Sequence, residues 1–199
     1  MKKLLDHIKR IEHGFKHIFE AGNTILADEK QKHLDLATSF LDDDSYQVRM
    51  LATYILGHLS TNNQKALKLL KTKVADDKDW RVQEMLAKAF DYYCMTIGYE
   101  KSLPTINKWL EDKNPNVKRA VVEGLRIWTS RPYFRDNPTV AIHLISAHKS
   151  DDSEYLRKSV GNALRDIGKK YKDDIINEIS QWDLTNKKTA FTYKLAKGK

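Results

Sequence analysis

A repeated sequence motif is the feature that most constrains the fold of this chain. Four segments open with acidic or small residues and then place an apolar anchor at helical spacing, at Val48, Val82, Val117 and Leu156. The anchors are 34, 35 and 39 residues apart, which is typical of repeats built from two helices. The opening residues suit turns and helix N-caps. The sequence therefore predicts a helical repeat protein.

Shorter amphipathic segments lie between the repeats: "EKQKHLDLATSFL", "NQKALKLLKTKV", "SLPTINKWLEDK" and "TVAIHLISAHK". A single helical pair cannot bury its apolar face, whereas stacked pairs form a continuous core. The alternating pattern of strands is absent, and no linker rich in Gly, Pro or Ser divides the chain. We predict an all-α curved solenoid of HEAT-like repeats. It forms a single domain over residues 1–199, with well-formed repeats over about 28–181, a short N-terminal helical part and a basic C-terminal end.

Composition narrows the class of protein and of partner. The 35 Lys and Arg residues against 27 Asp and Glu give a net charge of +8, which favours a polyanionic partner. With one cysteine, Cys94, a disulfide framework is excluded. No apolar run approaches the roughly 18 residues of a membrane span, so we expect a cytoplasmic monomer without a membrane partner. His13 and His17 lack further ligands at metal-binding spacing, and no phosphate-binding loop is present. We therefore expect neither metal nor cofactor.

Aligning the four repeats groups equivalent residues into columns. The following columns lie on the face of each helix that points away from the apolar stripe. The first column holds Met50, Glu84, Arg119 and Lys158; one turn later come Tyr54, Lys88, Glu123 and Asn162, with Asp166 beyond; Arg49, Gln83, Lys118 and Arg157 directly follow the anchors. One interpretation is a solvated face with salt bridges between repeats. The other is a ligand surface, on which the basic side chains near helix N-termini contact phosphates.

Trp80 is the residue that the solvated-face interpretation explains least well. Its indole lies one helical turn before Glu84, away from the core stripe. Leaving such a side chain off the core forfeits about 1.5–3 kcal/mol of burial, unless something else covers it. Either a neighbouring loop covers Trp80, or the ring stacks on a cationic or aromatic ligand.

Three of the repeat phrases carry a family resemblance. "DWRVQEMLAKAFDYYC", "NPNVKRAVVEGLRIWTSRPYF" and "SEYLRKSVGNALRDIGKKY" resemble the HEAT-like DNA alkylation repair family, the AlkC and AlkD glycosylases, over roughly residues 40–180. The residues of these segments are nearer to those of the AlkC branch. The resemblance implies a hydrolase that grips duplex DNA in a basic concave cleft and excises N3- and N7-alkylated purines.

The resemblance also implies roles for particular residues. In AlkD-type members an aspartate follows a tryptophan by four residues, the spacing of Trp80 and Glu84; AlkC-type members have a glutamate there and a later aspartate. Glu84 and Asp166 match as catalytic carboxylates, which would stabilise an oxocarbenium-like sugar. The resemblance implies that Arg119 contacts the DNA backbone. Together with the repeat columns, it makes these residues the candidate contacts to the sugar, base or phosphates: Trp80, Arg49, Lys88, Arg119, Arg157, Lys158 and Asn162.

Two departures from the family pattern keep other functions open. Asn162 stands where AlkD-type members have a second tryptophan, and only about 40 residues precede the first of the four aligned segments. Loss of damage-reading helices there would leave a non-catalytic DNA-binding paralogue, for branched or bent DNA. A protein-binding scaffold is a further alternative, because HEAT-type solenoids often bind acidic proteins.

Overall fold

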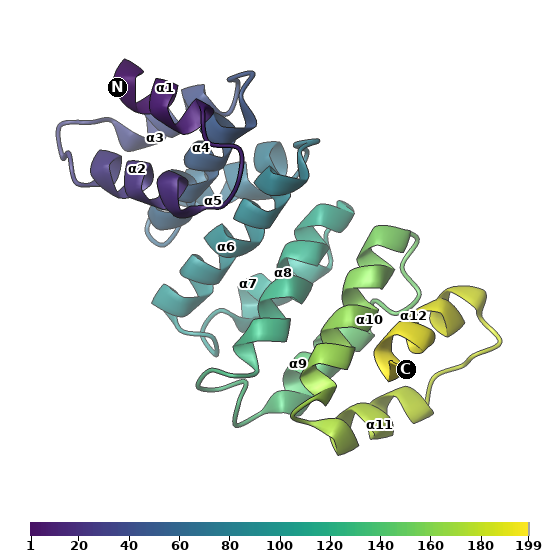
Figure 1. The fold of residues 1–199 in the computed structure, drawn as a ribbon. Coiled ribbons are helices and arrows are strands. Elements are labelled where there is room, and N and C mark those ends of the chain that lie inside the picture. The colour runs from purple at the N-terminus through teal and green to yellow at the C-terminus, as the bar shows by residue number, and fades with distance from the viewer. Residues whose placement is uncertain (199) are drawn as a thin grey trace. The chain divides into compact units, whose positions relative to one another are not determined.

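The computed structural model describes residues 1–198, and within them every regular element is a helix (Figure 1). The all-α HEAT-like prediction is confirmed. The helices form two compact units, the first ending at Ile97 and the second beginning at Gly98. The expectation of a single curved domain stays a prediction. None of the described helices combines the length and apolarity needed to cross a membrane.

The first unit contains three helical pairs. Helices α1 and α2 form its N-terminal pair, α3 precedes the first predicted repeat helix, and a short α5 followed by one π-helical segment precedes the second. The bounds are α1 Lys2–Lys9, α2 Lys16–Leu26, α3 His33–Phe40, α4 Tyr46–Leu59, α5 Gln64–Leu69, η1 Leu70–Val74 and α6 Trp80–Ile97.

The second unit also contains three helical pairs. The third and fourth predicted repeat helices are α8 and α10, each preceded by its partner helix, and a further pair follows them. The bounds are α7 Leu103–Leu110, α8 Pro115–Trp128, α9 Pro138–Ser146, α10 Glu154–Gly168, α11 Lys172–Ser180 and α12 Lys187–Lys197.

The loops before the four repeat helices share one turn. In each loop an aspartate accepts a hydrogen bond from the backbone N–H two residues later, at 2.8–2.9 Å; these are Asp43, Asp77, Asp112 and Asp151. Such a turn reverses the chain locally and leads into the next helix. The four anchors that follow are fully buried. The acidic openings of the repeats are thus explained by turn formation.

The basic C-terminal end folds as a helix that packs on α10. On α12, Thr192 is fully buried and its hydroxyl donates to the backbone carbonyl of Lys149 at 2.6 Å. The approach of the two helices is close at Gly161: a Cβ there would lie 2.5 Å from the Cβ of Leu195 and 3.0 Å from the Thr192 carbonyl oxygen. Glycine at this position is therefore required by packing.

We predict that Gly161→Ala makes the protein less stable than Gly168→Ala by about 1–3 kcal/mol, the usual cost of overpacking. Both substitutions lie on α10 and add one methyl group, but at Gly168 the nearest side-chain atom is 3.5 Å away, an ordinary contact. The measurement is urea-induced unfolding, monitored by circular dichroism. Equal stability of the two variants would contradict the close packing of α12.

Candidate nucleic-acid interface

Helix α6 has two faces with different environments. Val82, Leu86 and Phe90 are fully buried. On the other side Trp80, the first residue of the helix, is 59% exposed, and the half-buried Glu84 follows one turn later. These residues lie four apart because the α-helix has 3.6 residues per turn. The exposed face of α6 thus offers an indole and a carboxylate to a ligand.

Part of the Trp80 ring is covered by Arg81 rather than by a loop alone. The Arg81 guanidinium carbon lies 4.9 Å from the centre of the Trp80 ring and 4.3 Å from that of Tyr46. Its Nη1 donates to Asp79 at 3.2 Å. The cavity that Trp80 borders, together with residues 11–15, measures about 60 Å³. Ligand pockets usually hold about 300–1,000 Å³, so the ring presents an open face, not a pocket.

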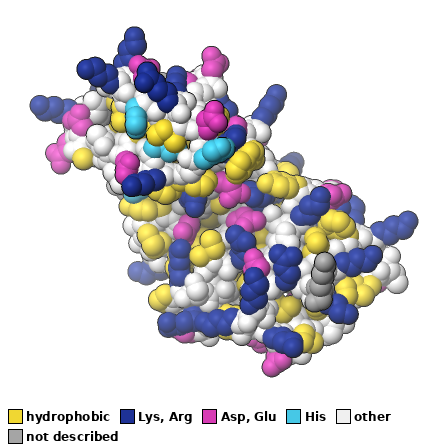
Figure 2. All heavy atoms as spheres, viewed as in Figure 1, with side chains coloured by type: hydrophobic (Ala, Val, Ile, Leu, Met, Phe, Trp, Pro, Cys, Tyr) yellow, Lys and Arg dark blue, Asp and Glu magenta, His cyan; other side chains and the backbone are white. Residues whose placement is uncertain are grey.

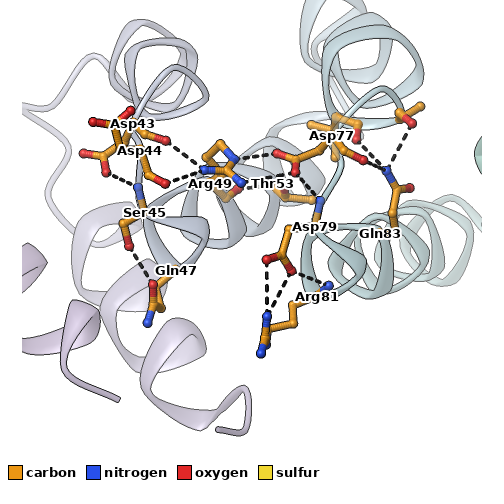
Figure 3. Close-up of polar contacts among 12 residues, drawn as sticks. Asp43, Asp44, Ser45, Gln47, Arg49, Thr53, Asp77, Asp79, Arg81 and Gln83 are labelled. Atoms are coloured by element: carbon orange, nitrogen blue, oxygen red, sulfur yellow. Dashed lines mark hydrogen bonds and ion pairs between the residues drawn. The ribbon is translucent and has the colours of Figure 1, made fainter. Parts of the chain in front are cut away.

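Arg49 is held by protein acceptors (Figure 3). Its Nε donates to the Asp77 carboxylate at 2.6 Å, and its Nη1 donates to the carbonyl oxygens of Asp43 and Asp44 at 3.0 and 2.9 Å. The hydrogen bond to Asp77 raises the pKa of Arg49 above its ordinary value. In the same column Gln83 donates to the carbonyl oxygen of Asp77 at 2.6 Å. These side chains join the loops before α4 and α6.

The same arrangement recurs in the second unit. Arg157 is buried, and its Nη1 donates to the carbonyl oxygens of Asp151 and Asp152 at 2.6 and 3.0 Å. The Lys118 ammonium forms a salt bridge with the Asp151 carboxylate. The column directly after the anchors therefore holds loops together. Because this accounts for Arg49 and Arg157 structurally, the DNA contacts proposed below do not include them.

The other expected DNA contacts differ in accessibility. Arg119 is only 6% exposed, and its guanidinium carbon lies 4.6 Å from the centre of the Tyr155 ring. Lys88 and Lys158 are exposed, although the Lys158 ammonium is 2.8 Å from Glu154. Asn162 is half-buried on α10. Among the expected cations, the two lysines are thus the most available to a phosphate.

Asp166 is surrounded by cations. Its carboxylate lies 2.9 Å from the Lys169 ammonium and 3.1 Å from Nη1 of Arg126. The hydrogen bond from Lys169 is the main cause that lowers the pKa of Asp166; burial opposes the shift, and Arg126 adds to it. Figure 2 shows the same mixture more widely, with acidic side chains between the Lys and Arg side chains on the face of α8 and α10. The charge of Asp166 is therefore largely compensated.

Sequence reasoning missed four residues on these faces. Tyr46 and Arg81 surround Trp80, while His58 and Tyr92 lie in contact with each other, with ring centres 3.8 Å apart. A signal for the second pair was present, because one further turn along the columns leads from Tyr54 to His58 and from Lys88 to Tyr92. Arg81 and Tyr46 gave none, since only the fold brings the two repeats together there.

Comparisons with known proteins give the context for this geometry. The profile of the family described as "DNA alkylation repair enzyme" matches residues 16–195. The structure of AlkD2 from Streptococcus mutans is similar with a TM-score of 0.90 and 46% identity, over 98% of this chain and 94% of that one.

Two more distant relatives are also similar. The Pseudomonas fluorescens alkylpurine DNA glycosylase AlkC, bound to DNA containing an abasic site analogue, shares the fold with a TM-score of 0.52 and 20% identity, over 92% of this chain and 60% of that one. The uncharacterised protein YhaZ of Bacillus subtilis is 31% identical over 106 residues, or 51% of this chain and 30% of that protein. By identity the chain is nearer to AlkD2 than to AlkC, which corrects the expected leaning towards the AlkC branch.

We predict that Arg49→Ala lowers the free energy of unfolding by about 1.5–3 kcal/mol, because hydrogen bonds to charged groups are lost and Asp77 keeps a part-buried charge. The matched control is Lys73→Ala, which removes an exposed salt bridge to Asp42 and should cost at most about 1 kcal/mol. Denaturant unfolding measures both. A smaller loss for Arg49→Ala than for the control would contradict its structural role.

Proposed function

The chain belongs to the DNA alkylation repair enzyme family, and from this premise we propose that it binds duplex DNA and excises cationic N3- or N7-alkylated purines. The observation that carries the proposal is the exposed Trp80 indole, one helical turn before the Glu84 carboxylate on α6. An exposed aromatic face beside a carboxylate attracts a cationic nucleotide, because the ring binds a cation more favourably than it binds water.

The reaction requires little from the protein beyond electrostatics. An alkylated purine is already cationic, so the glycosidic electron pair leaves with it and the base departs neutral. The sugar then carries the positive charge, as in the hydrolysis of glycosides. The Glu84 carboxylate stabilises that charge and orients a water molecule, whose oxygen bonds to C1′ and whose proton passes to the carboxylate. Trp80 contacts the deoxyribose or the base.

Side chains of each unit supply the phosphate contacts, and the two lysines among them are exposed. In the first unit Lys88 extends the face of Trp80 and Glu84 by one turn. In the second unit Lys158 and Asn162 lie four apart on α10, and Arg119 supplies charge from beneath Tyr155. Each phosphate neutralised by a lysine releases condensed counterions, so binding should weaken as salt increases.

Excision should depend on Glu84 and not on Asp166. We predict that Glu84→Gln lowers the rate of release of 7-methylguanine or 3-methyladenine from methylated DNA by about 10²–10³-fold, the usual cost of losing one electrostatic contact to a transition state. Asp166→Asn should retain most of the rate, because the charge of that carboxylate is already compensated. Normal excision by Glu84→Gln would contradict the assignment of the carboxylate.

The affinity for duplex DNA should depend on the lysine contacts and can be measured without excision. We predict that Lys88→Ala weakens binding uniformly across sequences and reduces the slope of log affinity against log salt by about one. Lys73→Ala, which removes an exposed lysine from η1, should leave the slope unchanged. Fluorescence anisotropy at several salt concentrations measures both. An unchanged slope for Lys88→Ala would contradict its phosphate contact.

A second candidate is a DNA-binding member of the family without excision activity. It is favoured by the Arg81 guanidinium stacked on Trp80 and by the compensated charge of Asp166. This candidate would be established over the first if wild-type protein binds duplex or branched DNA in a salt-dependent way and releases no alkylated base. Absence of DNA binding would contradict both and would favour the protein-binding scaffold.

A further inference from the structure

A pocket of about 410 Å³ lies within the first unit, and Lys88 lines it, whereas Trp80 and Glu84 do not. Its walls come from α2, α4 and α6, which pack in succession in that unit (Figure 1). The volume falls within the range of about 300–1,000 Å³ that small-molecule sites occupy. The pocket is thus large enough for a ligand of its own.

Four of the nine residues that line the pocket carry aromatic rings. Phe19 of α2, Tyr54 and His58 of α4 and Tyr92 of α6 follow one another, with ring centres 5.2, 4.5 and 3.8 Å apart. All four line the pocket. A connected series of rings offers π-faces and edges, the surface on which planar heteroaromatic groups stack.

The Tyr54 ring is fixed in place before any ligand arrives. It lies against the backbone of α2, where a Cβ on Gly22 would be 2.2 Å from its Cδ1. Its hydroxyl donates to the Asn23 side chain at 2.7 Å. Any larger residue than glycine at position 22 would displace the ring. This wall is therefore preorganised, which reduces the entropy lost on binding.

The polar groups of the pocket suit a base that carries a phosphate. Burial holds the pKa of His58 below its ordinary value, so at neutral pH its imidazole has one donor and one acceptor nitrogen. Asp91 and Asn23 supply oxygen acceptors. Lys88 brings a positive charge to the same pocket, beside the negative charge of Asp91, and its ammonium is the group that a phosphate would contact.

The pocket also continues the face that presents Trp80 and Glu84. Tyr92 lies eight residues after Glu84 on α6, a separation of about 12 Å along the helix axis. Lys88 lies between them and lines the pocket. A strand held at Glu84 and Lys88 would therefore pass close to the aromatic wall.

We propose that this pocket of the first unit binds one unpaired nucleobase, stacked against the rings of Tyr54, His58 and Tyr92, with Lys88 on the adjoining phosphate. The base comes either from a nucleotide in solution or from a DNA strand. The second source rests on the proposed DNA binding, whereas recognition of the base does not.

The test uses 2-aminopurine, whose fluorescence is quenched when it stacks on an aromatic ring. The probes are 2-aminopurine deoxyribonucleoside 5′-monophosphate and a DNA duplex with one bulged 2-aminopurine. We expect saturable quenching by wild-type protein, at least ten-fold weaker binding for Tyr92→Ala, and nearly normal binding for Tyr92→Phe, which keeps the ring. Circular dichroism of both variants checks that they are folded.

Binding at the pocket and excision at Glu84 are separated by two further variants. Trp80→Ala and Glu84→Gln should bind the free nucleotide as wild-type protein does, while excision falls. Quenching of the free nucleotide alone identifies a nucleotide in solution as the source, and quenching of the bulged duplex identifies the strand. No saturable quenching with either probe, or equal affinity of Tyr92→Ala and wild type, overturns the proposal whether or not the protein excises alkylated bases.

Discussion

The bonds between one repeat and the loop that precedes the next hold this structure together. Arg49 binds the Asp77 carboxylate and the carbonyl oxygens of its own loop, and Lys118 binds Asp151 in the second unit. Without these cations the part-buried carboxylates would lose their ionic partners, although each still accepts one backbone N–H, and an unsatisfied polar group costs about 1–3 kcal/mol. The cations at these positions therefore have a structural role in the loops before α4, α6 and α10.

This constraint determines which side chains remain for a ligand. With Arg49 and Arg157 held in loops and Arg119 beneath Tyr155, we assign most of the proposed affinity for DNA to exposed lysines such as Lys88. A carboxylate near such cations weakens the binding of an anion. Its presence there therefore favours a role in the chemistry. Glu84 is half-buried one helical turn after the exposed indole of Trp80, and the Asp166 carboxylate lies among several cations. We accordingly assign the chemistry to Glu84.

Helix α6 joins the two proposals for the first unit. Trp80 and Glu84 occupy its first turns, and Tyr92 lies two turns further on in the aromatic pocket. One face of a single helix can thus present a carboxylate to a sugar and a ring to a base, because residues four apart share that face. The core side of α6, with Val82 and Phe90 fully buried, keeps this spacing rigid.

The sequence by itself determined the repeat helices, their buried anchors and the two faces of α6, because period and apolar spacing are local properties of the chain. It also indicated the family through three repeat phrases. Only the tertiary structure decided that Arg49 and Arg157 bind loops and that Arg81, held between Tyr46 and Trp80, covers part of the Trp80 ring. Likewise, only packing of α2, α4 and α6 brings Phe19, Tyr54 and Tyr92 to one pocket. A side chain's partner depends on which repeats lie beside it, and that neighbourhood is set by the packing of whole helices.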